Sequence, residues 1–157
     1  MRLQNSDTPA QELSRFLLHL DRAAVIACAE RALSAFKAED ASPPECGFTL
    51  LPLQDGALGQ RFFLGEVPVS VSHVSLKHKN GTICHGGAVI MRDDIELARS
   101  IAILEAVLSQ CVEPMPEPAE LLRQAIAVSS ERDSAMQAAI DRTRVDFSIL
   151  PGGADAA

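Results

Sequence analysis

The chain has 157 residues, with 14 Lys and Arg against 21 Asp and Glu, so its formal net charge is −7. Hydrophobic residues make up 47% and charged residues 22%. This composition is typical of a globular domain and excludes a wholly disordered, collagen-like or low-complexity chain. A chain of this length predicts one domain, residues 1–157, with a core of its own. The acidic balance and the scattered basic residues argue against nucleic acid as the main partner.

The sequence lacks the marks of secretion and of membrane insertion. Polar residues from Asn5 onward interrupt the segment that would be apolar in a signal peptide. The longest apolar run, Ala23–Ala29, is far shorter than the roughly 18 residues of a membrane span. The cysteines are widely spaced, without a C-x-x-C pair: Cys28, Cys46, Cys84 and Cys111. We therefore expect a cytoplasmic protein with reduced cysteines and no membrane partner.

The N-terminal region predicts two helices. Thr8, Pro9 and Gln11 are the residue types of a capped helix start. Asp21 is expected to begin a second helix with an apolar side that extends to Phe36, and the segment 38–44, with two prolines, is expected to end it. Residues 1–7 and 151–157 are expected to be frayed.

Glycine marks the next region, because seven of the nine glycines lie between residues 47 and 87. Glycine favours turns over helix interiors. Short strands are expected at 48–53 and 62–64. A type I′ hairpin at Asn80-Gly81 is expected to join strand 67–79 to a return strand 82–91. The apolar positions change parity at Ser72-His73, which predicts a bulge or a change of face.

Helices follow the strands. Asp93 is expected to begin a third helix that is apolar enough to be buried on more than one side, and a fourth is expected from about 118 to 140. Near the C-terminus, apolar residues alternate with polar ones at Val145, Phe147 and Ile149. This pattern is consistent with a short final strand. The sequence thus predicts an α+β fold, with a mainly antiparallel sheet over residues 47–91 flanked by N- and C-terminal helices.

The histidines suggest a metal site as one hypothesis. His73 and His78 could meet Cys84 and His85 across the hairpin. However, the spacing matches no common zinc signature, and each pair has opposite parity along a strand, so the four side chains cannot share a face without a bulge. We therefore expect no metal site and a core position for Cys84. No P-loop, dinucleotide-binding motif or nucleophile motif is present, so no catalytic residue is predicted.

Two segments have the pattern of an association surface. Phe62 and Phe63 are adjacent in a predicted strand, so they point to opposite faces, and one of them needs cover from a further layer or a partner. Arg144, Val145 and Phe147 belong to the final strand, which suits edge pairing with another chain. The alternative is that both are internal strands. The candidate interface is Arg61, Phe62, Phe63, Arg144, Val145 and Phe147, with Arg61 and Arg92 as candidate contacts to a phosphate or an acid.

These segments carry a resemblance to a known family. Residues 59–66, Gly-Gln-Arg-Phe-Phe-Leu-Gly-Glu, resemble the G-E-R-F-F-x-G-D stretch of the PhnG subunits of the bacterial carbon–phosphorus lyase system. Met91-Arg92-Asp93 is similar to that family's G-R-D turn, residues 97–106 to its A-E-x-x-A-x-x-D-A helix, and residues 144–147 to its R-V-D-F ending. The similarity runs in order from about residue 10 to 153. This chain departs from the family patterns at Gln60, Glu66, Met91 and Ser148.

The resemblance implies a non-catalytic subunit of the carbon–phosphorus lyase core complex. With a nucleosidase-like partner, such subunits support displacement of adenine from ATP by an alkylphosphonate, which gives an α-D-ribose 1-alkylphosphonate 5-triphosphate. It implies no cofactor on this chain, since the iron–sulfur cluster and S-adenosylmethionine belong to a partner subunit. The isolated chain is expected to be inactive and could form a homo-oligomer. The alternative is a stand-alone small metal- or His-dependent enzyme that uses His73, His78 and His85.

Overall fold

The computed structural model describes residues 10–110 and 115–144. The helices are α1 (Ala10–Leu17), α2 (Arg22–Ala32), the 3-10 turn η1 (Leu33–Ala35), α3 (Ile95–Gln110) and α4 (Pro116–Thr143). The strands are β1 (Phe36–Gln54), β2 (Arg61–His78) and β3 (Ile83–Ile90), and both pairings in the order β1-β2-β3 are antiparallel. The expected α+β fold with a mainly antiparallel sheet and helices at both ends is confirmed.

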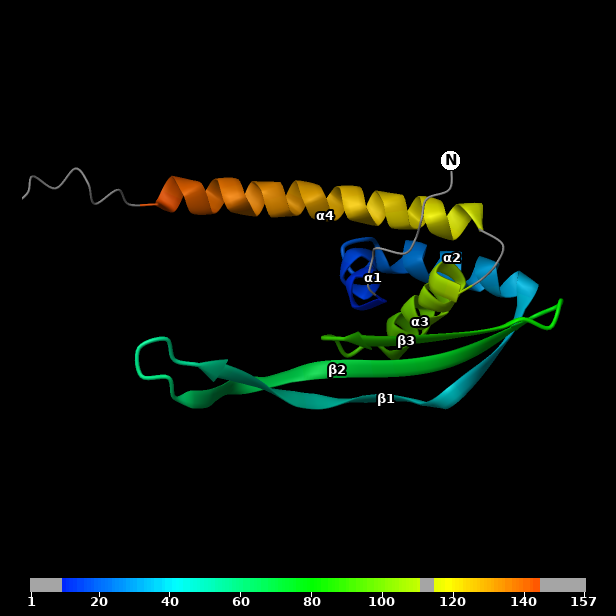
Figure 1. Ribbon diagram of the computed structural model, residues 1–157, viewed down its shortest axis with the longest axis horizontal. Helices are drawn as coiled ribbons and strands as arrows, with labels where there is room; N and C mark the ends of the chain where they lie inside the picture. The colour runs from blue at the N-terminus through cyan, green and yellow to red at the C-terminus, as the bar shows by residue number, and fades with distance from the viewer. Residues whose placement is uncertain (1–9, 111–114, 145–157) are drawn as a thin grey trace, which may run out of the picture.

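The helices lie on one face of the sheet (Figure 1). α3 lies next to the sheet, α1 and α2 come next, and α4 is the outermost layer (Figure 1). α3 packs very closely on β3 at Gly86, where an added Cβ would lie 2.1 Å from the backbone oxygen of Ala102. The core is made mainly of Leu, Ile, Val and Ala from all four α-helices and the sheet. Within the described ranges, no helix is both long and apolar enough to span a membrane.

One face of β2 supplies the sheet's share of the core. The even-numbered residues Ser70, Ser72, Val74 and Leu76 are buried, while the odd-numbered residues between them are half-buried or exposed. The register against β3 is continuous from Ser70 to Lys77. The parity change expected at Ser72-His73 is therefore a change of face. The preceding valines lie on the uncovered face, and two serines occupy core-facing positions.

The structure corrects the expected end of the second helix. Phe36 begins a strand, so β1 starts well before residue 47 and includes the segment 38–44 that was expected to end the helix. The strand tolerates Pro43 and Pro44 because β1 is an edge strand, where a missing N–H breaks no ladder on the solvent side. The pairing with β2 also shifts between Asp40 and Glu45, which places the prolines at an irregular part of the ladder.

Two smaller expectations are corrected as well. The side chain of Asp94, rather than that of Asp93, caps α3, since its Oδ1 accepts a hydrogen bond from the Leu97 N–H at 3.0 Å. The hairpin at Asn80-Gly81 is present, but only Gly81 has a positive φ, of 92°, so the turn is not type I′. The His78 N–H instead donates to the Thr82 carbonyl oxygen across a three-residue loop.

The first two strands extend beyond the third. β3 pairs only with Ser70–Lys77 of β2, whereas β1 and β2 remain paired from Gly47 and Val69 out to Gln54 and Arg61. We call residues 47–69 the arm. It projects past β3 on the same side as the C-terminal half of α4 (Figure 1). The expected final strand at 145–149 lies outside the described residues.

Candidate association surface

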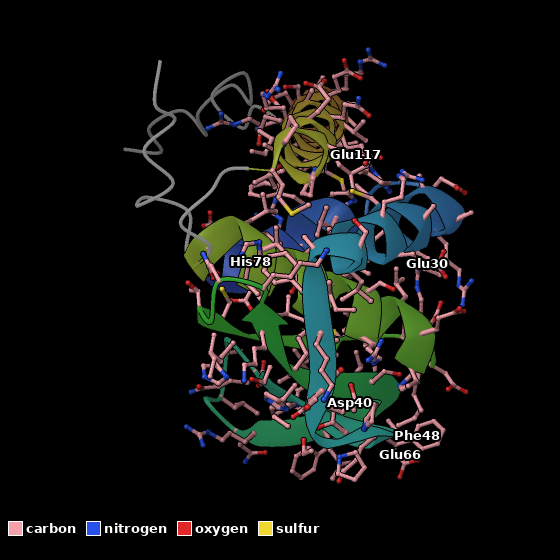
Figure 2. The ribbon with its side chains drawn as sticks, turned by 90° about the vertical axis from the view of Figure 1, so that its right-hand side faces the viewer. Glu30, Asp40, Phe48, Glu66, His78 and Glu117 are labelled. Carbon is pink, nitrogen blue, oxygen red and sulfur yellow. The ribbon has the colours of Figure 1, made fainter. Side chains whose placement is uncertain are left out.

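The arm carries many large apolar side chains that the rest of the chain leaves uncovered. No residue from 47 to 69 is buried. Seven of the fourteen exposed large apolar side chains in the described ranges belong to it, with exposed fractions from 40% to 75%: Phe48, Leu50, Leu53, Leu58, Phe62, Phe63 and Leu64. Figure 2 shows Phe48 at the foot of the molecule, on the opposite side from Glu117 of α4. A monomer rarely exposes contiguous apolar surface of this kind unless it binds something there.

Both faces of the arm are apolar. Leu53 is the direct strand partner of Phe62, and Pro52 is the partner of Phe63. Directly paired residues point to the same face and adjacent residues point to opposite faces, so each face of the tip carries one Phe. Phe62 is 49% exposed and Phe63 is 64% exposed. Neither ring fills a core, which argues against the alternative that this is an internal strand.

A bulge lies between the two halves of the arm. Leu50 pairs with Glu66 and Pro52 pairs with Phe63, so two residues of β2, Leu64 and Gly65, oppose a single residue of β1. Bulges bend and twist a strand locally and are common at the edges of sheets. Leu64, one of the two bulge residues, is 63% exposed.

The β3 side of the arm is an open sheet edge within the described part of the chain. The His78 N–H points toward β3, and the continuous register means that the other even-numbered residues of β2 point the same way. Beyond Ser70 this alternation directs the backbone groups of Glu66 toward the open edge. Pro68 falls on the same side, where its missing N–H costs no ladder bond. An open edge with exposed apolar side chains is a template for pairing with another strand.

The structure separates the three candidate arginines. Arg61 is exposed at the tip of the arm, and Arg144 is exposed at the end of α4. Arg92 follows β3, and its carbonyl oxygen accepts a hydrogen bond from Ser70 Oγ at 2.8 Å. Ser70 is nine residues along β2 from Arg61, which is about 30 Å of extended strand. Arg61 and Arg92 are therefore too far apart to bind the same small anion. Val145 and Phe147 lie outside the described residues.

The histidines of the alternative enzyme hypothesis do not converge. His73 and His85 lie on the uncovered face of the sheet, where they are exposed. His78 lies on the other face with its ring 5.0 Å from that of Phe36, and Cys84 is buried in the core as expected. Among residues 10–110 and 115–144, no group of three or more His, Cys, Asp or Glu side chains is placed to hold a metal ion.

A polar cluster joins the arm's base to the start of α3. Cys46 Sγ donates to Asp93 Oδ1 at 2.9 Å, and this hydrogen bond raises the pKa of the thiol. Arg22 binds Asp94 through both carboxylate oxygens at 2.7 and 3.0 Å, and this pairing lowers the pKa of Asp94. A thiol kept protonated is a poor nucleophile. Because the carboxylates of Asp93 and Asp94 bind Cys46 and Arg22, the cluster connects structural elements and leaves neither carboxylate free for catalysis.

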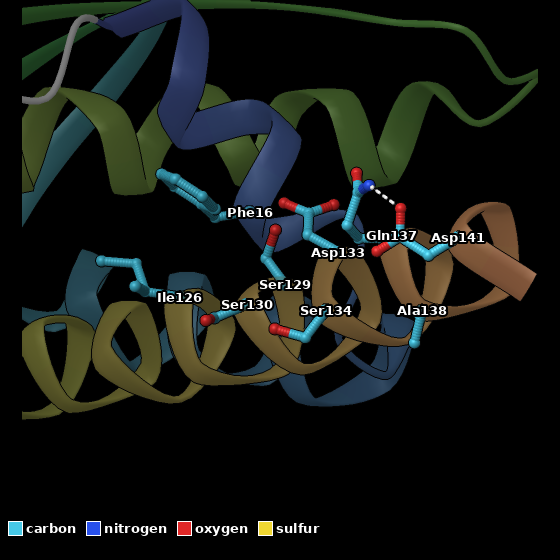
Figure 3. Close-up of a pocket in the computed structure, with 9 residues that line it drawn as sticks. All are labelled: Phe16, Ile126, Ser129, Ser130, Asp133, Ser134, Gln137, Ala138 and Asp141. Atoms are coloured by element: carbon cyan, nitrogen blue, oxygen red, sulfur yellow. Dashed lines mark hydrogen bonds between the residues drawn. The ribbon is translucent and has the colours of Figure 1, made fainter. Parts of the chain in front are cut away.

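A groove between α1 and α4 is one of the concave features of the molecule (Figure 3). Phe16 faces it from α1, and its remaining lining comes from α4 (Figure 3). Some of its polar groups are engaged, since Gln137 Nε2 donates to Asp141 Oδ1 at 3.0 Å and Arg15 of α1 pairs with Asp133 at 2.9 Å. Ser129 Oγ, in contrast, is buried without a hydrogen-bond partner among the described residues. The groove offers no activated base or nucleophile.

Sequence reasoning found part of this surface. It identified Arg61, Phe62 and Phe63, and it missed Phe48, Leu50 and Leu58, which are equally exposed. The available signal was the high density of large apolar residues on both sides of the Asp55-Gly56 turn, since a hairpin with two apolar faces needs cover on both.

Comparison with known proteins identifies one match. The family model described as phosphonate metabolism protein PhnG matches residues 9–153, which is nearly the whole chain and includes the entire arm. No curated protein matches the chain.

Proposed function

The chain belongs to the PhnG family of phosphonate metabolism proteins, and from this premise we propose that it is a non-catalytic subunit of a carbon–phosphorus lyase core complex. In this role it supports transfer of an alkylphosphonate to the ribose of ATP. A phosphonate oxygen forms a bond to C1 of the ribose, the bond from C1 to adenine breaks, and adenine leaves with a proton. The setting is the cytoplasm.

The observation that carries the proposal is the exposed apolar arm. Seven large apolar side chains lie in 23 residues of which none is buried, so the chain presents a surface that is suited to a protein partner. The described residues, in contrast, offer no convergent set of base, nucleophile and anion-binding groups. A subunit that positions or stabilises a partner fits both features. The nucleosidase-like subunit is the first partner to test, and the iron–sulfur cluster and S-adenosylmethionine belong to another subunit.

Reconstitution tests the proposal directly. The purified chain is mixed with ATP and methylphosphonate, alone and together with the other products of its phosphonate operon, and adenine release and the new phosphonate ester are measured. The isolated chain should give no product, the complete set should give product, and omission of this chain should reduce the yield to background. Turnover by the isolated chain, or full turnover without it, would contradict the proposal.

Metal analysis gives an independent check on the alternative enzyme. The purified chain should contain no stoichiometric zinc, because the three hairpin histidines lie on two faces of the sheet. Zinc at one equivalent that is lost in His73→Ala or His85→Ala would support the stand-alone enzyme instead.

A further inference from the structure

The tip of the arm has a self-complementary sequence at an open edge. Residues 61–66 read Arg-Phe-Phe-Leu-Gly-Glu, with a cation at one end, an anion at the other and large apolar side chains between them. β3 covers β2 only from Ser70 to Lys77, so this stretch has no neighbour on its β3 side in the part of the chain that the structure describes. The backbone N–H of Glu66 points to that side.

The two charged side chains are available for a partner. Arg61 and Glu66 are both exposed, and neither makes an ion pair within residues 10–110 and 115–144. Figure 2 shows Glu66 beside Phe48 at the foot of the molecule, away from the helices. Some exposed charged residues elsewhere are already paired within the chain, such as Lys37 with Glu39 at 2.9 Å. Arg61 and Glu66 can therefore pair with a partner without breaking an ion pair within residues 10–110 and 115–144.

We propose that two copies of the isolated chain pair through this edge, with residues 61–66 of one copy antiparallel to residues 66–61 of the other. In this register Arg61 lies directly opposite Glu66 of the partner subunit, and the two-fold axis creates this ion pair twice. Because the bulge at Leu64 and Gly65 takes up one residue, this stretch spans five ladder positions, and Phe63 lies opposite Phe63 of the partner subunit at the two-fold axis, which brings the two rings into cross-strand contact. A parallel arrangement would instead place like charges opposite each other.

The register also explains where the pairing stops. The backbone nitrogen of Pro68 faces the same edge but carries no hydrogen, so a partner strand would lose one hydrogen bond there. From Ser70 onward the edge is already occupied by β3. Only about six residues per copy can pair. The surface area that they bury is therefore well below the roughly 800 Å² per partner of a standard interface. The dimer is therefore weak, and its two apolar faces remain free. This pairing does not depend on the proposed function, because the faces that a complex partner would cover stay open.

Charge reversal tests the pairing with a built-in control. Sedimentation of the purified full chain from about 1 to 200 μM should show a monomer–dimer equilibrium that weakens as salt is raised, since the ion pairs are exposed. Arg61→Glu and Glu66→Arg should each weaken the dimer by about tenfold, because each converts two attractive pairs into two repulsive ones. The double variant Arg61→Glu/Glu66→Arg restores opposite charges and should return to within about threefold of the original dimer constant.

The outcomes decide the proposal. All variants should keep the thermal melt of the original chain, because both residues are exposed. A monomer across the whole concentration range would overturn the pairing, as would a dimer insensitive to the single reversals. Failure of the double variant to recover would also overturn it, since the effect would then come from a cause other than the pairing of Arg61 with Glu66.

Discussion

Asp94 connects three parts of the molecule at the start of α3. Its Oδ1 caps the helix at the Leu97 N–H, and both of its carboxylate oxygens bind Arg22 of α2. Its own N–H donates to Ser70 Oγ of β2 at 2.9 Å. The Asp94 side chain is only 13% exposed, so these bonds are partly protected from water. One residue thus fixes the helix, the neighbouring helix and the sheet relative to one another.

Asp94→Ala should lower the free energy of unfolding by about 1–2 kcal/mol, because the helix loses its cap and Arg22 loses a partner. Asp93→Ala is the matched control, since Asp93 is exposed and binds only the Cys46 thiol at this site. It should cost less than about 0.5 kcal/mol. Urea denaturation of the three proteins measures the difference. Equal costs would mean that the cap lies at Asp93, as the sequence predicts.

The same carboxylate predicts a pH dependence. Arg22 lowers the pKa of Asp94 below its usual 3.8, so the folded state binds this proton less tightly than the unfolded state. The stabilisation by Asp94 is therefore fully present above about pH 4 and is lost as the pH falls through the lowered value. The stability difference between the original chain and Asp94→Asn should be constant near neutral pH and should shrink below about pH 4. A constant difference down to about pH 2 would contradict this assignment.

Gly86 tests how closely α3 approaches the sheet. A Cβ at this position would lie 2.1 Å from the backbone oxygen of Ala102 and 2.8 Å from the Cβ of Ala106. Gly86→Ala must therefore push α3 off β3, and we expect a loss of about 3 kcal/mol or more. Gly47→Ala is the control, because nothing lies within 4 Å of its added Cβ. Chemical denaturation should separate the two variants clearly. Equal stability would show that α3 has room to move.

At the scale of elements, the sequence predicted most of the helices and the order of the strands. Apolar periodicity and the glycine-rich middle fixed those features without tertiary information. The start of β1 could not be predicted, because Pro43 and Pro44 argue against a strand until the strand is known to be an edge. The exposure of the arm also could not be predicted. It depends on β3 ending opposite Ser70, which no local pattern in β2 reveals.

Phe63→Ala should affect association and leave folding unchanged. The ring is 64% exposed, so its removal should shift the thermal melt very little. If it anchors a partner, truncation should weaken binding by roughly 2–4 kcal/mol. Pull-down with the partner subunits proposed above measures the binding. Val89→Ala is the matched control, because Val89 is 61% exposed on β3 outside the arm. The idea fails if Phe63→Ala unfolds the chain or if both variants bind equally well.

At the scale of the whole molecule, stability and association lie in different regions. The buried core is formed by the helices together with β3 and the part of β2 that β3 covers. The arm contributes no buried residue. It projects from this core in the same direction as the C-terminal half of α4, in which residues 131–144 are all exposed (Figure 1). This separation suits a subunit whose core folds by itself and whose exposed apolar arm is covered by other chains of a complex.

This division can be tested by removing the arm. Gly47 and Val69 are direct strand partners, so residues 48–68 can be replaced by Asn-Gly, which closes a two-residue hairpin between them. The shortened chain should fold with nearly the same thermal melt, because no deleted residue is buried and the shorter loop lowers the closure entropy. It should fail to co-purify with the other operon products and should not restore adenine release in the reconstituted system. A shortened chain that still assembles would place the association surface on α4 or on the uncovered face of the sheet, where Ile83 and Val89 are exposed.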